Sequence, residues 1–465
     1  MTGLRLAAPT AALIDAATGE RLGGQALRDA IDAAARRAAA LPNGIVFHGI
    51  TPTTASVVDY LGTVASGRAV ALLDPHLPGD TVRSWADRFA PAALNGVDGR
   101  DIDGYARHGD SWIRTAPAGP APHPALGLLL ATSGSTGEAK LVRLSTTAVT
   151  ANARAIAEAL RITPEDVAPT SLPLFYSYGL SVLHSHLTTG ATVLLADGGV
   201  LADEFWRAVD AHGATSLSGV PHHYRLLDRI GWQPRRHPSL RTLTQAGGRL
   251  EPTRVAALAD AAAEAGAVLH VMYGQTEATA RMTVLPASAL PTKLGSAGLP
   301  IPGGHIAVRT ESGALTTEPD VTGEIVYTGP NVMLGYACDA ADLARGDDLG
   351  GVLATGDLGH LDVDGFLWLT GRRARTGKIF GVRVNLDDIE TIAADAAGRP
   401  VAVTPAADRV VVWCDGADNA ITRRVRDRLK LALRLHGTGF DVRPLDALPV
   451  LPTGKVDYRR LEADS

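Results

Sequence analysis

The chain has 465 residues, of which 46% are hydrophobic and 20% charged, and its formal net charge is −5. A chain of this length exceeds one compact hydrophobic core, so several domains or subdomains are expected. The acidic balance, with no block of basic residues, excludes nucleic acid as the main partner. Two widely separated cysteines exclude a disulfide framework and favour the reducing cytoplasm. The apolar runs are too short to span a bilayer, so membrane insertion is not expected. Asp15, Glu20 and Arg21 interrupt the apolar stretch near the N-terminus, so a signal peptide is not expected either.

Up to about residue 300, helical and strand-like segments alternate along the chain, which predicts a mostly parallel α/β sheet. Helices are expected at residues 26–41, 56–66, 147–160 and 202–212, and strands at 44–48, 69–73, 126–130, 191–195 and 267–272.

Beyond residue 300 the pattern changes to short strands between tight turns, which predicts a smaller β-rich subdomain. Strands are expected at residues 305–309, 323–327 and 366–369. The basic stretch 371–378 (GRRARTGK) has little periodicity and is typical of a linker. A small α+β domain is expected after it, with helices at residues 386–397 and 421–435 and strands near Val401 and Val410.

The strongest local motif follows the apolar strand at 126–130 and reads TSGSTGEAK over residues 132–140. Its glycines let the backbone approach an anion, and its hydroxyl and amide groups can hold phosphate oxygens. Lys140 supplies countercharge. The spacing differs from the GxxxxGK[ST] loop, so a P-loop nucleotidase is not supported. The residues expected to contact phosphate are Thr132, Ser133, Gly134, Ser135, Thr136 and Gly137.

Four further motifs combine glycines with charged groups. Tyr273-Gly-Gln-Thr-Glu277 follows a strand, and its carboxylate is a ligand that Mg²⁺ accepts beside nucleotide phosphates. Thr355-Gly-Asp357 places a carboxylate at a turn, where it can accept both hydroxyls of a ribose. The others are Gly371-Arg372, which precedes KIFGVRV at residues 378–384, and Pro452-Thr-Gly-Lys455. Each of these is weak alone, because turns with one charged residue are common.

Lysine is scarce in this chain, which has only five: Lys140, Lys293, Lys378, Lys430 and Lys455. A lysine is a compact, flexible point charge, whereas arginine is a bulky planar fork. Three of the five, Lys140, Lys378 and Lys455, fall inside the glycine-containing motifs. This distribution favours functional roles for those three, with chance as the alternative for each one singly.

Taken in order, the motifs resemble the ANL superfamily of adenylate-forming enzymes, which comprises acyl- and aryl-CoA ligases, adenylation domains of peptide synthetases, and luciferases. Supporting matches are residues 172–180 (LPLFYSYGL), 246–248 (AGG), 295–300 (GSAGLP), 323–324 and 329–336 (GPNVMLGY). The resemblance covers essentially the whole chain. It implies a large N-terminal domain (residues 1–374) of two α/β subdomains plus a β-rich subdomain, and a small mobile α+β domain (375–465).

The resemblance also implies roles for single residues. Glu277 corresponds to the magnesium ligand, Thr276 to the α-phosphate contact, and Lys455 to the lysine that bridges substrate carboxylate and α-phosphate. Attack of a carboxylate on a phosphate brings two anions together, so a metal ion and a positioned ammonium group agree with this chemistry. The remaining nucleotide contacts are Lys140 and the 132–137 loop for the terminal phosphates, and Asp357 with Arg372 for ribose. The residues that sandwich adenine are Ala246, Gly247, Gly248, Tyr273 and Gly274, and Gln275 beside them belongs to the nucleotide site. Lys378 and Gly381 are assigned to the second half-reaction, and Arg375 to the hinge.

The acid pocket is expected around Tyr176, Tyr178, Gly179 and His222. Thioester-forming relatives often have histidine where this chain has Tyr176. Amino-acid-activating relatives place an aspartate at the position that looks like Gly179, so an α-amino acid is disfavoured. Bulky polar walls favour an aryl or short polar acid. Histidines at 184, 186, 222 and 223 are interpreted as ordinary core or surface residues, with a metal site as the lesser reading.

The function expected from the resemblance is activation of a small carboxylic acid by ATP and Mg²⁺, followed by transfer to a thiol, with CoA as co-substrate. Loading of a separate carrier protein is the close alternative. Tyr176 keeps open the activation of an unusual acid such as nitrite for attack by an amine. A nucleotide-binding pseudoenzyme is the alternative from another class, and the intact Lys455, Glu277 and Asp357 argue against it.

Overall fold

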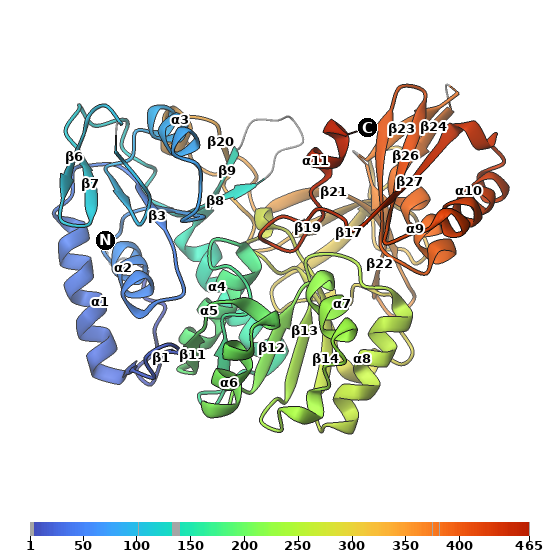
Figure 1. Ribbon diagram of the computed structural model, residues 1–465. Coiled ribbons are helices and arrows are strands. Elements are labelled where there is room, and N and C mark those ends of the chain that lie inside the picture. The colour runs from blue at the N-terminus through green and yellow to red at the C-terminus, as the bar shows by residue number, and fades with distance from the viewer. Residues whose placement is uncertain (1–3, 101, 133–139, 374, 381, 465) are drawn as a thin grey trace. The chain divides into compact units, whose positions relative to one another are not determined.

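The computed structural model describes residues 4–100, 102–132, 140–373, 375–380 and 382–464, with the side chains of Thr132 and Arg383 excepted (Figure 1). The chain forms two compact units. Unit 1 is Met1–His305 with Tyr327–Leu353, and unit 2 is Ile306–Val326 with Ala354–Ser465. The sequence predicts a different division, into an N-terminal domain of residues 1–374 and a mobile C-terminal domain of residues 375–465. That division stays a prediction.

The largest sheet of unit 1 has eight strands in the order β20-β9-β8-β4-β3-β5-β7-β6. Its centre is parallel, and both edges are antiparallel. One edge strand, β20, comes from a segment far along the chain and pairs with β9. The strands are β3 (Val46–Gly49), β4 (Val70–Leu73), β5 (Ala93–Asn95), β6 (Tyr105–His108), β7 (Ser111–Arg114), β8 (Leu126–Thr132), β9 (Lys140–Ser145) and β20 (Gly335–Ala337).

Two further sheets complete unit 1. In one, β1 and β10 each pair in parallel with β11, and β2 is antiparallel. In the other, β12, β13 and β14 are parallel and β15 and β16 antiparallel. The strands are β1 (Ala12–Asp15), β2 (Arg21–Gly23), β10 (Val167–Pro169), β11 (Thr192–Leu195), β12 (Ser216–Gly219), β13 (Thr242–Gln245), β14 (Val268–Tyr273), β15 (Thr283–Leu285) and β16 (Leu299–Pro300).

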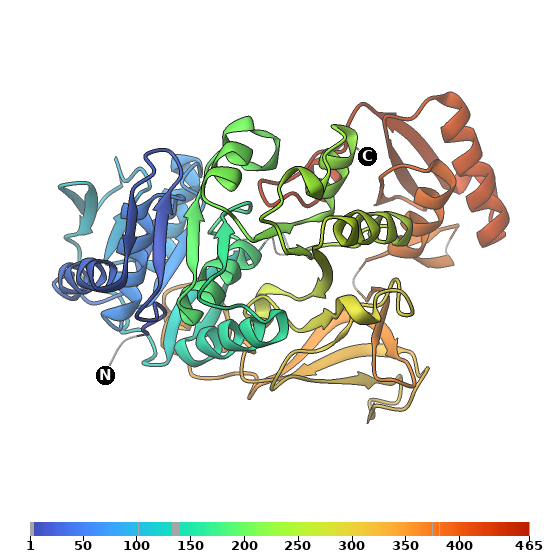
Figure 2. The same cartoon turned by 90° about the horizontal axis from the view of Figure 1, so that it is seen from below.

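Two helices of unit 1, α2 and α4, begin at side-chain caps. Thr53 accepts from the Ser56 amide at the start of α2, and Ser145 accepts from the Ala148 amide at the start of α4. Helices α4 and α5 run side by side (Figure 2). The helices are α1 (Gly24–Ala39), α2 (Thr54–Ala65), α3 (Gly79–Phe89), α4 (Thr146–Leu160), α5 (Ser177–Thr189), α6 (Asp203–Ala211), α7 (Pro221–Arg229) and α8 (Pro252–Glu264).

Unit 2 holds a five-stranded sheet, a two-stranded hairpin and a three-stranded sheet. Helices α9 and α10 pack against each other, and both contact the three-stranded sheet (Figure 1). Its elements are β17 (His305–Arg309), β18 (Leu315–Thr316), β19 (Gly323–Thr328), β21 (Val352–Leu361), β22 (Leu367–Arg372), β23 (Thr376–Ile379), β24 (Val382–Asn385), α9 (Leu386–Ala397), β25 (Val401–Ala406), β26 (Arg409–Asp415), α10 (Asn419–Leu433), β27 (Phe440–Leu445) and α11 (Tyr458–Ala463).

The predicted α/β class with several sheets is confirmed. The predicted linker at 371–378 is too long, because β22 ends at Arg372 and β23 begins at Thr376. Gly371 and Arg372 take part in the pairing of β22 with β21, and backbone pairing needs no hydrophobic periodicity. Among the residues that the structure describes, no helix is both long and apolar enough to cross a bilayer.

Candidate active site

Three parallel strands of unit 1 end at one edge of their sheet, and the sequence motifs follow those ends. Strands β12, β13 and β14 end at Gly219, Gln245 and Tyr273. The AGG segment 246–248 continues from β13, and the YGQTE motif begins on β14. Because the carboxyl ends of parallel strands lie at one edge, this edge is where an open α/β sheet binds ligands. The sheet therefore brings the two predicted adenine-contacting segments together.

The backbone after β14 folds into a tight, strained turn. A Cβ on Gly274 would lie 1.7 Å from the Ala280 carbonyl oxygen, so only glycine fits there. Thr279 and Ala280 both have positive φ, at 58° and 115°, which is unfavourable for residues with a side chain. The Asn331 side-chain amide donates to the Ala278 and Arg281 carbonyls at 2.8 and 3.0 Å. Surrounding hydrogen bonds thus hold a strained turn in place, as is common at binding sites.

Glu277 faces two groups from the eight-stranded sheet. The Tyr336 hydroxyl, on β20, donates to Glu277 Oε1 at 2.8 Å. Burial and the Glu277 carboxylate raise the pKa of Tyr336, so the phenol remains a donor at neutral pH. Lys140, the first residue of β9, places its ammonium nitrogen 5.8 Å from the centre of the Tyr336 ring. One carboxylate, one phenol and one ammonium group are thereby gathered beside the end of β14.

Thr276 contacts the start of helix α5. Its hydroxyl oxygen lies 3.1 Å from that of Ser177. Thr132 and Lys140 are paired across β8 and β9, which places the two ends of the predicted phosphate loop next to each other. The loop residues Ser133, Gly134, Ser135, Thr136 and Gly137 lie outside the described residues, so their contacts with phosphate stay predictions.

Two tyrosines, Tyr176 and Tyr178, pack close to strand β13 and the AGG segment that follows it. A Cβ on Gly247, whose φ is +83°, would lie 2.6 Å from the Tyr176 hydroxyl oxygen. The rings of Tyr176 and Tyr178 meet edge to face with centroids 6.3 Å apart. The hydroxyl of Tyr178 contacts Thr244 Oγ1 at 2.8 Å and donates to the Thr244 carbonyl at 3.1 Å. The predicted pocket residues Tyr176 and Tyr178 are therefore adjacent to a predicted adenine residue.

Gly179 and His222, the other predicted pocket residues, have different surroundings. A Cβ on Gly179 would lie 2.3 Å from the Pro173 carbonyl oxygen, so close backbone packing by itself requires glycine there. His222 is half-buried in the first turn of α7.

Unit 2 contains the predicted ribose-binding pair. Asp357 on β21 is opposite Arg372 on β22, and Arg372 Nε donates to Asp357 Oδ1 at 3.1 Å. The carboxylate is nearly buried at 6% exposure, whereas the arginine is 60% exposed. The Thr355 hydroxyl accepts from the Asp357 amide at 3.1 Å. Gly356, with φ of +73°, lies between them inside β21, so the turn expected at residues 355–357 is wrong and the carboxylate is held on a strand.

The lysines of unit 2 are exposed, and Arg375 is not. Lys455 lies on the exposed turn after Gly454, whose φ is +74°, and Lys378 lies on the exposed side of β23. Gly381 lies outside the described residues. The Arg375 guanidinium pairs with Asp387 and with Glu390, the latter at 2.9 Å.

Two of the buried histidines, His184 and His186, contact polar groups inside the protein. Tyr60 and His184 share a hydrogen bond of 2.8 Å, and His186 Nδ1 lies 2.9 Å from the Val182 carbonyl oxygen. Within the described part of the chain, no three histidine, cysteine, aspartate or glutamate side chains gather closely enough to hold a metal ion. Glu277 fits Mg²⁺ in another way, because this ion is usually held by one or two carboxylates together with nucleotide phosphates and water.

Sequence reasoning missed three residues of this site. Tyr336 is the last residue of the GPNVMLGY segment, but nothing in the sequence indicates that it contacts Glu277, 59 residues earlier. Asn331, in the same segment, fixes the turn after β14. Arg281, four residues beyond Glu277, lies with its guanidinium 4.4 Å from the centre of the Tyr178 ring. The only available signal was the polarity of these residues inside otherwise apolar segments.

Comparison with known proteins identifies the class. Residues 50–337 match the family model described as AMP-binding enzyme. Oxalate–CoA ligase from Arabidopsis thaliana is 36% identical over 256 residues, and 2-succinylbenzoate–CoA ligase from Bacillus cereus is 34% identical over 247 residues. These alignments cover 54% and 53% of this chain and 49% of each relative, so the chain matches about half the length of those proteins.

The likeness in fold extends over nearly the whole chain. The structure of o-succinylbenzoate CoA synthetase from Bacillus subtilis, in complex with an acyl-adenylate intermediate, superposes with a TM-score of 0.77. It covers 97% of this chain and 95% of that one at 22% identity. The chain belongs to the family of AMP-binding enzymes, within the ANL adenylate-forming superfamily that its motifs resemble.

Proposed function

We propose that this protein is an AMP-forming acid–thiol ligase that uses ATP and Mg²⁺ to activate a small carboxylic acid. In the first step, a carboxylate oxygen of the acid attacks the α-phosphorus of ATP and pyrophosphate leaves. In the second, a thiol sulfur attacks the acyl carbon and AMP leaves. The acceptor is CoA, as the names of the two relatives suggest.

The observation that carries this proposal is the gathering of Thr276, Glu277, Tyr336 and Lys140 beside the end of β14. A hydroxyl and an ammonium group can donate to the phosphate oxygens of a nucleoside triphosphate, and a carboxylate can bind its metal ion. Mg²⁺, when bound, neutralises charge on the phosphates, and Glu277 would hold it. Tyr336 keeps one oxygen of that carboxylate occupied and so orients the other.

The remaining residues have roles in orientation and charge balance. Lys140 offsets phosphate charge from the base of the loop at 132–137. Asp357, kept buried and beside Arg372, accepts the ribose hydroxyls. Lys455 brings a flexible ammonium group to the carboxylate and α-phosphate during adenylation, and its exposure suits a group that approaches and withdraws.

Acid-dependent exchange of pyrophosphate into ATP tests adenylation directly. Wild-type protein is incubated with ATP, Mg²⁺ and a panel of aryl, short-chain and inorganic acids, and thioester formation is then followed after addition of CoA. Exchange with at least one carboxylic acid is expected, and Lys455→Ala should reduce it on the order of 10²-fold. Lys430→Ala, an exposed lysine of α10, is the matched control. Exchange with no acid would support the pseudoenzyme, and exchange with nitrite alone would support the amine-acceptor alternative.

A further inference from the structure

Arg143 on strand β9 is a charged side chain enclosed completely inside unit 1. It is 0% exposed and lies between Val142 and Leu144, which are buried as well. Burial of a guanidinium costs desolvation free energy, and an ion pair in the interior often stabilises a fold no better than apolar residues of the same volume. The presence of an arginine here is therefore better explained by the groups that it holds in place than by a gain in stability.

All five N–H donors of this guanidinium are used. Nε donates to the Tyr336 carbonyl at 3.3 Å, and Nη2 donates to the Leu334 carbonyl at 3.1 Å. Nη2 also forms an ion pair with Asp348 Oδ2 at 2.5 Å. The remaining acceptors are the carbonyls of Arg345 and Gly346, at 2.6 and 3.1 Å. Every acceptor lies within residues 334–348, so one side chain of β9 holds this whole segment.

Gly335, between the two carbonyls nearest to β20, leaves room for the ion pair. Its φ is +129°, and a Cβ there would lie 2.3 Å from Asp348 Oδ2 and 2.8 Å from Arg143 Nη2. A residue with a side chain would therefore displace the guanidinium, the carboxylate or the backbone directly before Tyr336. The glycine allows the ion pair to lie against the strand that carries this tyrosine.

Backbone hydrogen bonds connect the same stretch to both of its neighbours. The Leu334 amide donates to the Arg143 carbonyl at 2.7 Å, and the Met333 amide donates to the Glu277 carbonyl at 2.8 Å. Two residues further on, the Tyr336 hydroxyl donates to Glu277 Oε1 at 2.8 Å. The segment that carries the phenol is thus bonded to β9 on one side and to the YGQTE turn on the other.

We propose that Arg143 is a positioning residue for the metal site and acts through Tyr336. Its five bonds fix the segment 334–348, so that the phenol occupies one oxygen of Glu277 and leaves the other for Mg²⁺. This inference rests on the proposed adenylation, in which Glu277 holds the Mg²⁺ that accompanies ATP. Mg²⁺ demands near-ideal octahedral geometry, so its binding depends on where that carboxylate is held. Loss of the five bonds weakens the contribution of Mg²⁺ to ATP binding rather than the binding of the nucleotide itself.

Calorimetric titration with ATP, once with Mg²⁺ and once without it, tests the inference without acid or turnover. The dissociation constant without Mg²⁺ divided by that with Mg²⁺ measures how much the metal ion strengthens ATP binding. Arg143→Lys keeps the charge but offers fewer donors than the guanidinium, and it should lower this ratio on the order of tenfold. A merely structural defect would weaken ATP binding equally in both titrations and leave the ratio unchanged, which would overturn the inference.

The double variant shows whether Arg143 acts through the phenol. Tyr336→Phe alone should lower the ratio by about tenfold as well. Arg143→Lys combined with Tyr336→Phe should lower it no further than either change alone, because two residues in one chain of contacts do not act additively. If the two factors multiply in the double variant, Arg143 does not act through Tyr336 and the inference is wrong.

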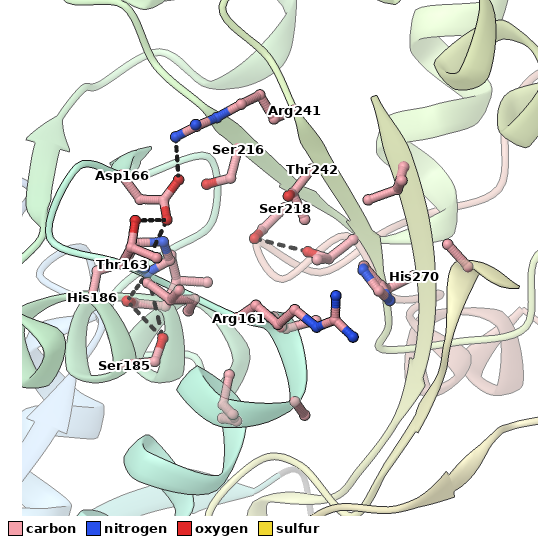
Figure 3. Close-up of a pocket in the computed structure, with 18 of the residues that line it drawn as sticks. Arg161, Thr163, Asp166, Ser185, His186, Ser216, Ser218, Arg241, Thr242 and His270 are labelled. Carbon is pink, nitrogen blue, oxygen red and sulfur yellow. Dashed lines mark hydrogen bonds and ion pairs between the residues drawn. The ribbon is translucent and has the colours of Figure 1, made fainter. Parts of the chain in front are cut away.

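Two control variants make the same chemical changes elsewhere in unit 1. Arg68 also donates to four backbone carbonyls, those of Ala39, Leu41, Pro42 and Gly44. Asp166 pairs with Arg241 at 3.0 Å in a cavity at the amino-terminal ends of β12, β13 and β14, the opposite edge of the sheet from the candidate active site (Figure 3). Asp348→Asn should lower the ratio, whereas Arg68→Lys and Asp166→Asn should not. An equal fall in the controls would assign the effect to general destabilisation and overturn the inference.

The same titrations separate this inference from the proposed function. If no acid supports pyrophosphate exchange, adenylation is wrong, while the ratio in Arg143→Lys still decides whether this residue positions the metal site. If Mg²⁺ does not strengthen ATP binding by wild-type protein, the assignment of Glu277 and this inference are both wrong.

Discussion

The phenol of Tyr336 is the residue whose contribution can be isolated most cleanly. It donates to Glu277 Oε1 without being a metal ligand itself. Tyr336→Phe keeps the ring beside Lys140 and removes only the donor. Second-sphere hydrogen bonds of this type orient the metal-binding carboxylate, so we expect the Mg²⁺ concentration for half-maximal pyrophosphate exchange to rise about tenfold. Tyr105→Phe, whose hydroxyl donates to the Pro91 carbonyl elsewhere in unit 1, should leave it unchanged. An unaltered Mg²⁺ dependence in Tyr336→Phe would contradict the assignment of Glu277.

His184 makes the stability of unit 1 depend on pH. Burial lowers its pKa from 6.5 to about 3, and its ring contacts the Tyr60 hydroxyl. Between these values the unfolded chain binds a proton that the folded chain does not, so stability is full above pH 6.5 and falls as the pH is lowered. The loss from this one group is about 1.4 kcal/mol between pH 7.5 and 5.5.

Denaturant unfolding at the two pH values measures this contribution. His184→Gln should lose about 1.4 kcal/mol less of its unfolding free energy on acidification than wild-type protein does. His108→Gln, an exposed histidine, should behave as wild type. An identical pH dependence in His184→Gln and wild type would show that His184 is protonated or accessible in the folded state.

At the scale of the element, the turn after β14 is held by steric fit as much as by hydrogen bonds. Gly274→Ala would place a Cβ 1.7 Å from the Ala280 carbonyl oxygen, so the turn must move. We expect a loss of roughly 3 kcal/mol in unfolding free energy and loss of exchange activity. Gly79→Ala is the control, because a Cβ there, at the start of α3, meets nothing within 4 Å. A Gly274→Ala variant with wild-type Tm and activity would show that this turn adapts freely.

Local sequence patterns predicted fewer than half of the helices and strands in the described part of the chain, and none of the contacts between them. The strand expected at 305–309 and the helix expected at 386–397 have the observed limits, because periodicity and capping are local properties. The YGQTE motif was recognisable for the same reason. Tyr336 and Arg281 were missed because their roles arise from packing of distant segments. Tyr336 reaches Glu277 only because β20 pairs with β9, a register that no local pattern encodes.

At the scale of the whole molecule, the predicted hinge at Arg375 can be tested by separating backbone from side-chain effects. The guanidinium of Arg375 contacts Asp387, Glu390, Val403 and Tyr458. Loss of the Arg375 guanidinium leaves the Glu390 carboxylate without its cation. The free energy of unfolding should therefore fall by roughly 3 kcal/mol in both Arg375→Pro and Arg375→Ala. Proline additionally fixes φ. If Arg375 is a hinge, only the proline variant should release pyrophosphate normally and form thioester slowly.

Both half-reactions are measured in both variants at a temperature where both are folded. Slow thioester formation in Arg375→Ala as well would assign the defect to the lost ion pairs. Unchanged kinetics in Arg375→Pro would place the hinge at another residue.

The pairing of β20 with β9 also bears on biosynthesis. Strand β9, with Leu141, Val142 and Leu144 buried, leaves the ribosome long before Gly335–Ala337 is translated. Until then, one edge of the nascent eight-stranded sheet has no partner, and an unpaired apolar edge can pair with other chains. Unit 2 is likewise assembled from two segments, and its first segment, Ile306–Val326, is translated before the second, Ala354–Ser465, with which it folds. A translational pause before codon 335 would therefore expose β9 to aggregation, whereas a pause after codon 353 would find all of unit 1 already synthesised.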